Sequence, residues 1–442
     1  MRQFRIASVL ACLVLILPAC SSAPTRSPPA HYDLLIRNGA VYDGSGAAAQ
    51  SVDVAVNGDR IVALLPAGTP ASATTVIDAG GHAVAPGFIN VLSWATESLI
   101  ADGRGMSDTM QGVTLEIFGE GWSGGPLTEA MRAQALKQQS DFHFPIPWTS
   151  LGEYLEHLQQ LGITPNIASF VGATTVRIHE LGEDDVAPTP EQLSRMQDLV
   201  RAAMREGALG VGASLIYPPA FFAKTDELVA LAQAAAESGG GYVAHMRSEA
   251  DQFLPALEET ITIARATGQH AEAYHLKAAG ARNWPKMAKA VARIDQARSE
   301  GVDIAANMYA YTAGATGLTA ALPPWVQAGG HDAMIKRLKD PAIRQRVIAE
   351  MKGPAKGWEN LRELAGDDSK VLFIGFRSEA LKPLTGKTLA DVIAQRGTSP
   401  EDTILDLIIE DDSRVDTAYF LMSEDNVELG LNGTDGNSET FN

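Results

Sequence analysis

The stretch "GALGVGASLIYPPAFFAKTDELVALAQAAAESGGGYVAHMRSE" (residues 207–249) decides the fold class. Its apolar run at residues 208–215 is followed by an amphipathic helical pattern at residues 224–240, which closes on glycine as helices commonly do. A second apolar run, at residues 241–248, follows directly. A strand, a helix and another strand in this order predict one unit of a parallel β/α architecture.

Runs of the same kind precede and follow this stretch. Five of them are expected to be strands, at residues 87–93, 112–119, 165–172, 271–278 and 302–311. Helical patterns lie between strands, for example at residues 189–207. Seven strand-then-helix units with nearly continuous apolar strands predict a sheet that is covered on its faces. We therefore expect an α/β fold, a (β/α)8 TIM-like barrel whose chemistry lies at the carboxyl ends of the strands.

Two segments depart from this alternation, although the barrel is expected over residues 86–442. Residues 31–85 alternate apolar and polar positions in short runs broken by Asn-Gly and Asp-Gly turns, which predicts antiparallel β-structure. Residues from about 313 to 420 fit the pattern poorly and are interpreted as an insertion between strands seven and eight. Within it we expect a basic helix, an apolar strand and a further helix, at residues 333–353, 371–376 and 399–411.

Residues 1–20 have the features of a secretory signal peptide. An arginine-containing start and the apolar run of residues 6–17 precede "LPAC", which ends at Cys20. This ending resembles the bacterial lipoprotein cleavage site, which implies lipid on Cys20 and a location in the bacterial cell envelope, lipid-anchored or periplasmic. An ordinary signal peptide whose last residue happens to be cysteine is the alternative. Residues 21–30 are polar and proline-rich, as expected for a flexible tether to a membrane.

The composition excludes some classes of protein. The hydrophobic content of 45% is ample for a large core, and a net charge of −18 without any basic run argues against a nucleic-acid partner. Both cysteines, Cys12 and Cys20, lie in the signal segment. The mature chain is therefore expected to contain neither a disulfide framework nor a cluster of thiolate ligands.

Three potential metal ligands follow predicted strands. His245 and His275 end two consecutive strands, and Glu120 lies in a glycine-rich turn after another. In a barrel these ends face one mouth, where two imidazoles and a carboxylate form a plausible three-ligand Zn2+ site with a fourth position left for water. A structural, hydrogen-bonded role is the alternative for each residue taken alone. Two strand-terminal histidines in consecutive units favour the metal site.

Cationic and aromatic residues near the two histidines are candidates for substrate binding. Lys277 lies two residues beyond His275, so it points to the same side of a strand. It either binds a substrate carboxylate or pairs with a neighbouring glutamate. Tyr309, Tyr311 and Tyr217 offer hydroxyl groups at the same mouth, or are packing residues.

Seven motifs follow one another along the chain: "DLLIRNGAVYDGSG", "APGFI", "QGVTLEIFGEGWS", "AHMRSE", "YHLKAAG", "YAYTAGATGL" and "GTDG". From about residue 32 to the end, the chain resembles the N-acyl-D-amino-acid deacylases of the amidohydrolase superfamily. The resemblance implies a metal-bearing (β/α)8 barrel, a small β-sandwich built from both chain termini and a lid-like insertion. It also implies hydrolysis of the N-acyl group from a D-amino acid.

The resemblance implies roles for individual residues. His245 and His275 match the strand-five and strand-six metal ligands, and Glu120 stands where many members have a cysteine ligand. Lys277 and the segment 309–311 match positions that hold the substrate carboxylate.

Two features depart from the family pattern. The strand-one His-x-His pair is replaced by Leu92 and Trp94, neither of which can donate a lone pair to Zn2+, so one ion is expected instead of two. Asp435 in "GTDG" matches the strand-eight aspartate that acts as general base. The residues before it contain no apolar run long enough for a full strand, so the barrel is expected to be incomplete at strand eight.

The preferred interpretation is a metal-dependent amidohydrolase acting on an N-acyl-(D-)amino acid or a related dipeptide-like amide. The alternative is an inactive envelope lipoprotein that binds acyl-amino acids or peptide fragments without turnover. A third reading is that the chain is an incomplete version of a longer gene product.

Overall fold

The computed structural model describes residues 31–139 and 141–432. The segments predicted as signal peptide and tether, with Cys20, lie outside the described residues, as does Asp435. The chain divides after Pro86 into two compact units, which are described separately. Within the described ranges, no helix combines the length and the apolar character that crossing a bilayer requires.

The first unit contains one mixed sheet of six strands. These are β1 (His31–Arg37), β2 (Ala40–Val41), β3 (Gln50–Asn57), β4 (Arg60–Pro66), β5 (Ser72–Asp78) and β6 (Ala83–Val84). Their order is β5-β1-β3-β2-β6, with β4 beside β3. The pairs β1/β3, β2/β3 and β3/β4 are antiparallel as predicted, whereas β1/β5 and β2/β6 are parallel. β5 runs parallel to β1 because the chain crosses from β4, on one side of β3, to the far side of β1.

The second unit contains the predicted series of parallel strands. These are β7 (Phe88–Asn90), β8 (Val113–Phe118), β9 (Asn166–Ser169), β10 (Val171–Gly172), β11 (Gly210–Ser214), β12 (Gly241–His245), β13 (Ala271–Ala273) and β14 (Ile304–Ala306). β7-β8-β9 and β10-β11-β12-β13-β14 form two parallel sheets. Only Phe170 separates β9 from β10, and its N–H donates to the carbonyl of Phe118. The seven predicted strands are therefore confirmed, with the third one broken at Phe170.

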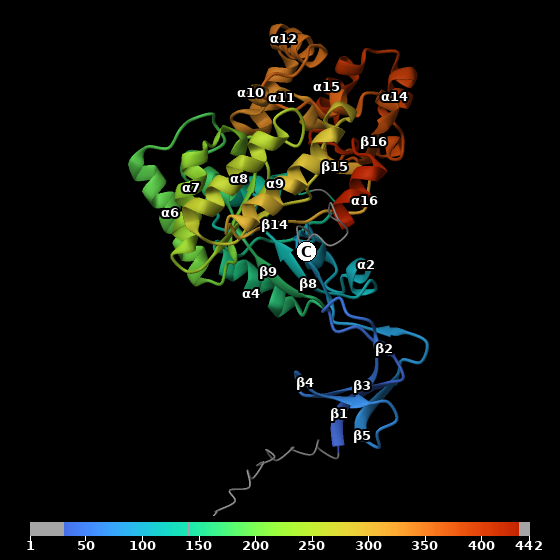
Figure 1. Cartoon of the computed structure of the whole chain (residues 1–442). Coiled ribbons are helices and arrows are strands. Elements are labelled where there is room, and N and C mark those ends of the chain that lie inside the picture. Colours follow the sequence, from blue (N-terminus) through green and yellow to red (C-terminus); the bar gives the residue numbers. More distant parts are fainter. Residues whose placement is uncertain (1–30, 140, 433–442) are drawn as a thin grey trace, which may run out of the picture. The chain divides into compact units, whose positions relative to one another are not determined.

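Helices cover the outside of this parallel series. The helices around the barrel are α1 (Ser98–Ala101), α2 (Met106–Thr109), α3 (Glu129–Gln138), α4 (Leu151–Leu161), α5 (Ala173–Leu181), α6 (Pro190–Arg205), α7 (Thr225–Ala236), α8 (Phe253–Thr267), α9 (Met287–Ser299) and α16 (Glu424–Asn432). Figure 1 shows α6, α7, α8 and α9 next to one another along the barrel. α6 begins where predicted, because Thr189 and Gln192 form a capping box around Pro190. Leu228, Leu231 and Ile261 of this layer are fully buried.

The segment interpreted as an insertion forms a small sheet with helices. Its elements are β15 (Ala313–Gly317), α10 (Pro324–Gln327), α11 (Gly330–Lys339), α12 (Pro341–Lys352), α13 (Leu361–Ala365), β16 (Val371–Gly375), α14 (Leu389–Arg396), α15 (Pro400–Asp411) and β17 (Asp416–Phe420). The sheet is antiparallel, in the order β15-β17-β16. It has its own hydrophobic cluster, which includes Val347, Phe373, Ile404 and Tyr419.

The prediction of a single basic helix at residues 333–353 is wrong. The helix ends at Lys339, and Asp340 caps a new helix by accepting hydrogen bonds from the N–H groups of Ala342 and Ile343. Pro341 has no N–H to continue the first helix, but its ring suits the first position of the second. The strand at β16 and the helix at α15 are confirmed.

Candidate metal centre

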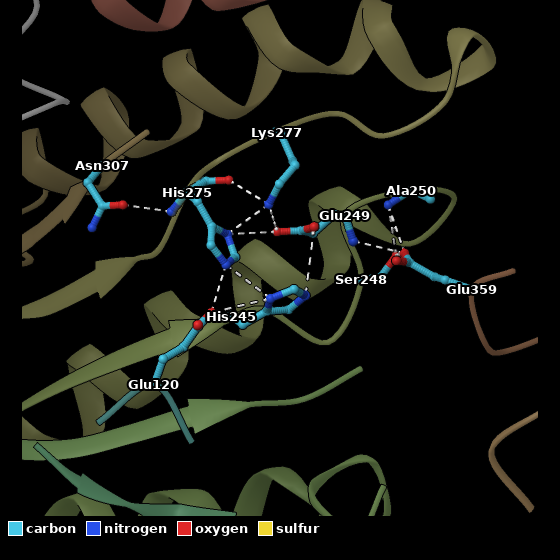
Figure 2. A network of polar contacts seen from close by, with 9 residues as sticks. All are labelled: Glu120, His245, Ser248, Glu249, Ala250, His275, Lys277, Asn307 and Glu359. Atoms are coloured by element: carbon cyan, nitrogen blue, oxygen red, sulfur yellow. Dashed lines mark hydrogen bonds and ion pairs between the residues drawn. The ribbon is translucent and has the colours of Figure 1, made fainter. Parts of the chain in front are cut away.

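Three side chains meet at the carboxyl ends of the barrel strands (Figure 2). Glu120 follows β8, His245 is the last residue of β12, and His275 follows β13. All three are buried or nearly so; the Glu120 side chain is 7% exposed and that of His245 is 6% exposed. The structure thus brings together the three residues that the sequence placed at one mouth.

The donor atoms of this triad lie very close to one another. Nε2 of His275 is 2.7 Å from Oε1 of Glu120, and Nδ1 of His245 is 3.4 Å from the same oxygen. The two histidine nitrogens are 3.1 Å apart. Ligand atoms at tetrahedral angles around Zn2+, with bonds of about 2.1 Å, would lie about 3.4 Å apart. The observed distances therefore suit a single ion, and within the described residues this is the one group with such geometry.

The outer nitrogens of the two histidines support the same assignment. Metal-bound histidines usually donate their second ring N–H to a carboxylate, a backbone carbonyl or water. Nδ1 of His275 is 3.1 Å from Oε1 of Glu249, and Nε2 of His245 is 3.7 Å from Oε2. Nε2 of His245 is buried and has no hydrogen-bond partner among the described residues. The Glu249 carboxylate therefore lies beside both histidines but is within hydrogen-bonding distance of His275 alone, and the donor atoms of Glu120, His245 and His275 fit one metal ion.

The charges of the centre oppose the effect of its burial. Burial alone would raise the pKa of Glu120, but the positive charge of His275 and the hydrogen bonds from both histidines hold it below its usual value. The pKa of Glu249 is likewise held low against burial by His245 and Lys277. Burial lowers the pKa of His245, which favours the neutral ring that a metal requires. Burial and Lys277 also act to lower the pKa of His275, yet the two glutamates raise it overall.

Two local features of the backbone set the positions of the ligands. Glu120 lies between Gly119 and Gly121, which both have positive φ. A Cβ at Gly119 would lie 2.3 Å from the carbonyl oxygen of Phe170, so this close approach of strands requires glycine. His275 has a φ of 38°, unusual for a side chain of its size, and its N–H donates to Oδ1 of Asn307 at 2.7 Å.

The predicted substrate-binding residues surround the centre. The ammonium of Lys277 donates hydrogen bonds to Glu249 Oε1 at 2.5 Å and to the His275 carbonyl at 2.9 Å, and it lies 2.8 Å from His275 Nδ1. The ring of Tyr217 lies 5.2 Å from that of His245, and the ring of Tyr309 lies 6.2 Å from that of His275. The next tyrosine, Tyr311, is 73% exposed, with its ring 6.4 Å from that of Tyr309.

Glu359, from the insertion, braces the loop that carries Glu249 (Figure 2). Its Oε1 accepts hydrogen bonds from the Ser248 hydroxyl at 2.5 Å and from the N–H groups of Glu249 and Ala250, both at 2.8 Å. Burial raises the pKa of Glu359 to about 7, and the nearby negative charge of Glu249 acts in the same direction. The insertion and the metal centre are therefore linked through one carboxylate.

The substitution Glu359→Gln should change how stability depends on pH. The folded chain keeps the Glu359 proton up to about pH 7, whereas the unfolded chain loses it near the usual value of 4.5. This group's contribution to the free energy of unfolding is therefore full below about pH 4.5, falls as the pH rises to about 7, and is constant above it. The free energy of unfolding of the wild type minus that of the variant, measured in urea, should decrease as the pH rises from 5 to 7. Parallel curves for the two proteins would contradict this assignment, and Glu363→Gln in the same insertion is the control.

Several residues of the centre were not predicted. Glu249 ends the motif "AHMRSE" but was assigned no role, and its contacts depend on the bend of the chain after β12. Glu359 lies more than one hundred residues from the loop that it holds. Asn307 directly follows β14, so a polar residue at a strand end was a signal that could have identified it.

Comparisons with known proteins found relatives by sequence and by structure. No family model matches the chain. The D-aminoacylase of Alcaligenes xylosoxydans xylosoxydans is 31% identical over 296 residues, which are 66% of this chain and 60% of that protein. The N-acyl-D-aspartate deacylase of the same organism is 35% identical over 260 residues, 58% of this chain and 51% of that protein. The chain thus spans less than two thirds of the length of these relatives.

Solved structures match over more of the chain. The N-acyl-D-glutamate deacylase of Bordetella bronchiseptica, complexed with zinc and a phosphonate mimic of the tetrahedral intermediate, has a TM-score of 0.73 and 26% identity, covering 91% of this chain and 74% of that one. A D-aminoacylase with a binuclear metal centre, in which one metal activates and the second attenuates, has a TM-score of 0.72 and 27% identity. The match covers 90% of this chain and 73% of that one. The expected resemblance is confirmed: the chain is similar in sequence and in fold to D-aminoacylases and N-acyl-D-amino-acid deacylases, which include amidohydrolases of known structure.

Proposed function

We propose that this protein hydrolyses the N-acyl amide bond of an N-acyl-D-amino acid or a related small amide, with one Zn2+ ion held by Glu120, His245 and His275. The observation that carries the proposal is the convergence of these three donor atoms at the barrel mouth, within 3.4 Å of one another. The names of the homologues supply the class of substrate.

The bound ion would supply a Lewis acid for the acyl carbonyl and lower the pKa of a water molecule. Glu249 orients His275 through its outer nitrogen, 3.1 Å away, and places its negative charge 3.7 Å from the outer nitrogen of His245. Lys277 acts on the substrate carboxylate through its charge and its remaining N–H group, because the other two N–H groups donate to Glu249 and to the His275 carbonyl.

Two further assignments complete the proposed site. Tyr217, Tyr309 and Tyr311 are proposed to contact the substrate, since their rings lie beside the histidines or one another. Asp435, proposed from its match to the family's general base, would take a proton from water and pass it to the leaving amine.

The test is the metal content and activity of the purified mature chain beside the double variant His245→Ala/His275→Ala. We expect about one zinc per chain and hydrolysis of N-acetyl-D-amino acids in the wild type, and neither in the double variant. The variant His270→Ala is the matched control, because that histidine lies on the surface beside Asp303. A folded wild type that binds zinc but releases no amino acid would overturn the enzymatic proposal in favour of a binding protein.

We also propose that lipid on Cys20 anchors the protein in the bacterial cell envelope. The support is the sequence of residues 1–30, a signal-like segment followed by a proline-rich tether. Expression of Cys20→Ala should release the protein from the membrane fraction, and unchanged fractionation would argue against lipid attachment.

A further inference from the structure

Trp94, which stands where the family pattern has a histidine, makes a direct contact with the metal centre. Its indole N–H donates to Oε2 of Glu120 at 2.8 Å. The other oxygen, Oε1, is the one that faces His245 and His275. The two oxygens of this carboxylate therefore have separate partners: one belongs to the ligand triad, and the other is held by tryptophan.

Burial of the ring does not account for tryptophan at this position. Trp94 is 55% exposed, so most of its apolar surface gains little from folding. The loop that carries it is fixed by its neighbour, because the N–H of Ser93 donates to the carbonyl of Ile117 in β8 and the Ser93 hydroxyl accepts from the N–H of Ala95. The indole N–H is consequently held over the end of the strand that leads to Glu120.

Leu92, the other position of the replaced His-x-His pair, has a packing role. Its side chain contacts a cluster formed by Phe170, Val243 and Tyr274. The hydroxyl of Tyr274 donates to the carbonyl of Val91 at 3.0 Å, which ties the same loop to β13. Neither strand-one position thus offers a ligand, and within the described residues Glu120 has no metal-binding partners other than the two histidines.

We propose that Trp94 is a positioning residue that keeps Glu120 a single-oxygen ligand, so that the centre binds one ion firmly without a second ion beside it. This inference rests on the proposed metal centre. A carboxylate with one oxygen held by a hydrogen-bond donor cannot turn to chelate the ion with both oxygens, nor offer its second oxygen to another ion. Hydrogen bonds of this kind to ligand groups typically change metal affinity by about 10- to 100-fold.

The variant Trp94→Phe tests the proposal, because it keeps an aromatic ring and removes the N–H. Trp325→Phe is a matched control: the indole of Trp325 donates to Oε2 of Glu350, also at 2.8 Å, in the insertion. Zinc affinity is measured by competition with a chromophoric chelator, and the thermal unfolding of each metal-free protein is recorded in parallel. We expect zinc affinity to fall about 10- to 100-fold in Trp94→Phe and to stay unchanged in Trp325→Phe.

The outcomes separate this inference from the proposed function. Equal zinc affinities of wild type and Trp94→Phe would overturn the inference while leaving the metal centre intact. A loss confined to the thermal stability of the metal-free protein would also overturn it, since Trp94 would then act only in folding. Wild type that takes up two ions more than His245→Ala/His275→Ala would contradict the single-ion arrangement. Wild type without zinc would overturn both proposals.

Discussion

The substitution Glu249→Ala should lower the free energy of unfolding of the metal-free chain by about 3–5 kcal/mol. Glu249 is 5% exposed and lies 2.5 Å from the ammonium of Lys277, which is 7% exposed. Removing the carboxylate leaves a buried cation whose nearest neighbours are a histidine nitrogen and a carbonyl. The cost arises because the buried ammonium has lost its hydration, and no ion pair with a carboxylate offsets that loss.

A double variant separates the loss of the ion pair from the loss of packing. Glu249→Leu/Lys277→Met removes both charges and keeps most of the buried volume, so it should be clearly more stable than Glu249→Ala in urea unfolding at pH 7. All proteins are measured with chelator present, so that bound metal does not contribute. If the double variant is as unstable as the single one, the pairing with Lys277 is not the source of the effect.

The substitution Arg177→Met should lower the free energy of unfolding by a similarly large amount. The Arg177 side chain is 1% exposed and joins α5 to Glu227 of α7, with Nη1 lying 2.8 Å and 2.7 Å from the two carboxylate oxygens. A second nitrogen, Nη2, donates to the carbonyl of Val186. Because Glu227 would remain buried without this partner, we expect the free energy of unfolding, measured in urea, to fall by about 3–5 kcal/mol.

Two comparisons make this prediction specific. Arg177→Met/Glu227→Leu should recover much of the lost stability, because no isolated charge remains. Arg201→Ala should cost less than about 1 kcal/mol, since Arg201 and Glu237 form an ion pair that is 31% and 54% exposed. Equal losses for Arg177→Met and Arg201→Ala would show that burial of the first pair has no energetic consequence.

The parts of the fold that follow from local sequence were predictable. β12 and β13 are apolar runs bounded by glycine-closed helices, and their polar ends place His245 and His275 at the mouth. The break between α11 and α12 was also readable, since Asp340 and Pro341 form a cap and a first helical position. It was missed because the basic, amphipathic pattern continues across the proline.

Contacts between distant segments could not be predicted in this way. Trp94 and Glu120 follow two different strands, and no periodicity indicates that an indole N–H meets a carboxylate there. Glu359 lies in a loop of the insertion, and its role depends on how that loop packs against residues 248–250. Sequence patterns predict the candidate ligands of such a centre, whereas the groups that hold these side chains depend on tertiary packing.

The left-handed backbone of His275 has a consequence for how the centre accepts an ion. A non-glycine residue in this conformation costs about 1–3 kcal/mol, and the bond from its N–H to Asn307 keeps it there. That cost is met when the barrel folds, before any ion arrives. Loading should therefore need little rearrangement of the chain, so little of the coordination energy is used to order the backbone. The backbone of the centre is thus preorganised, and we expect the ion to bind without an induced fit.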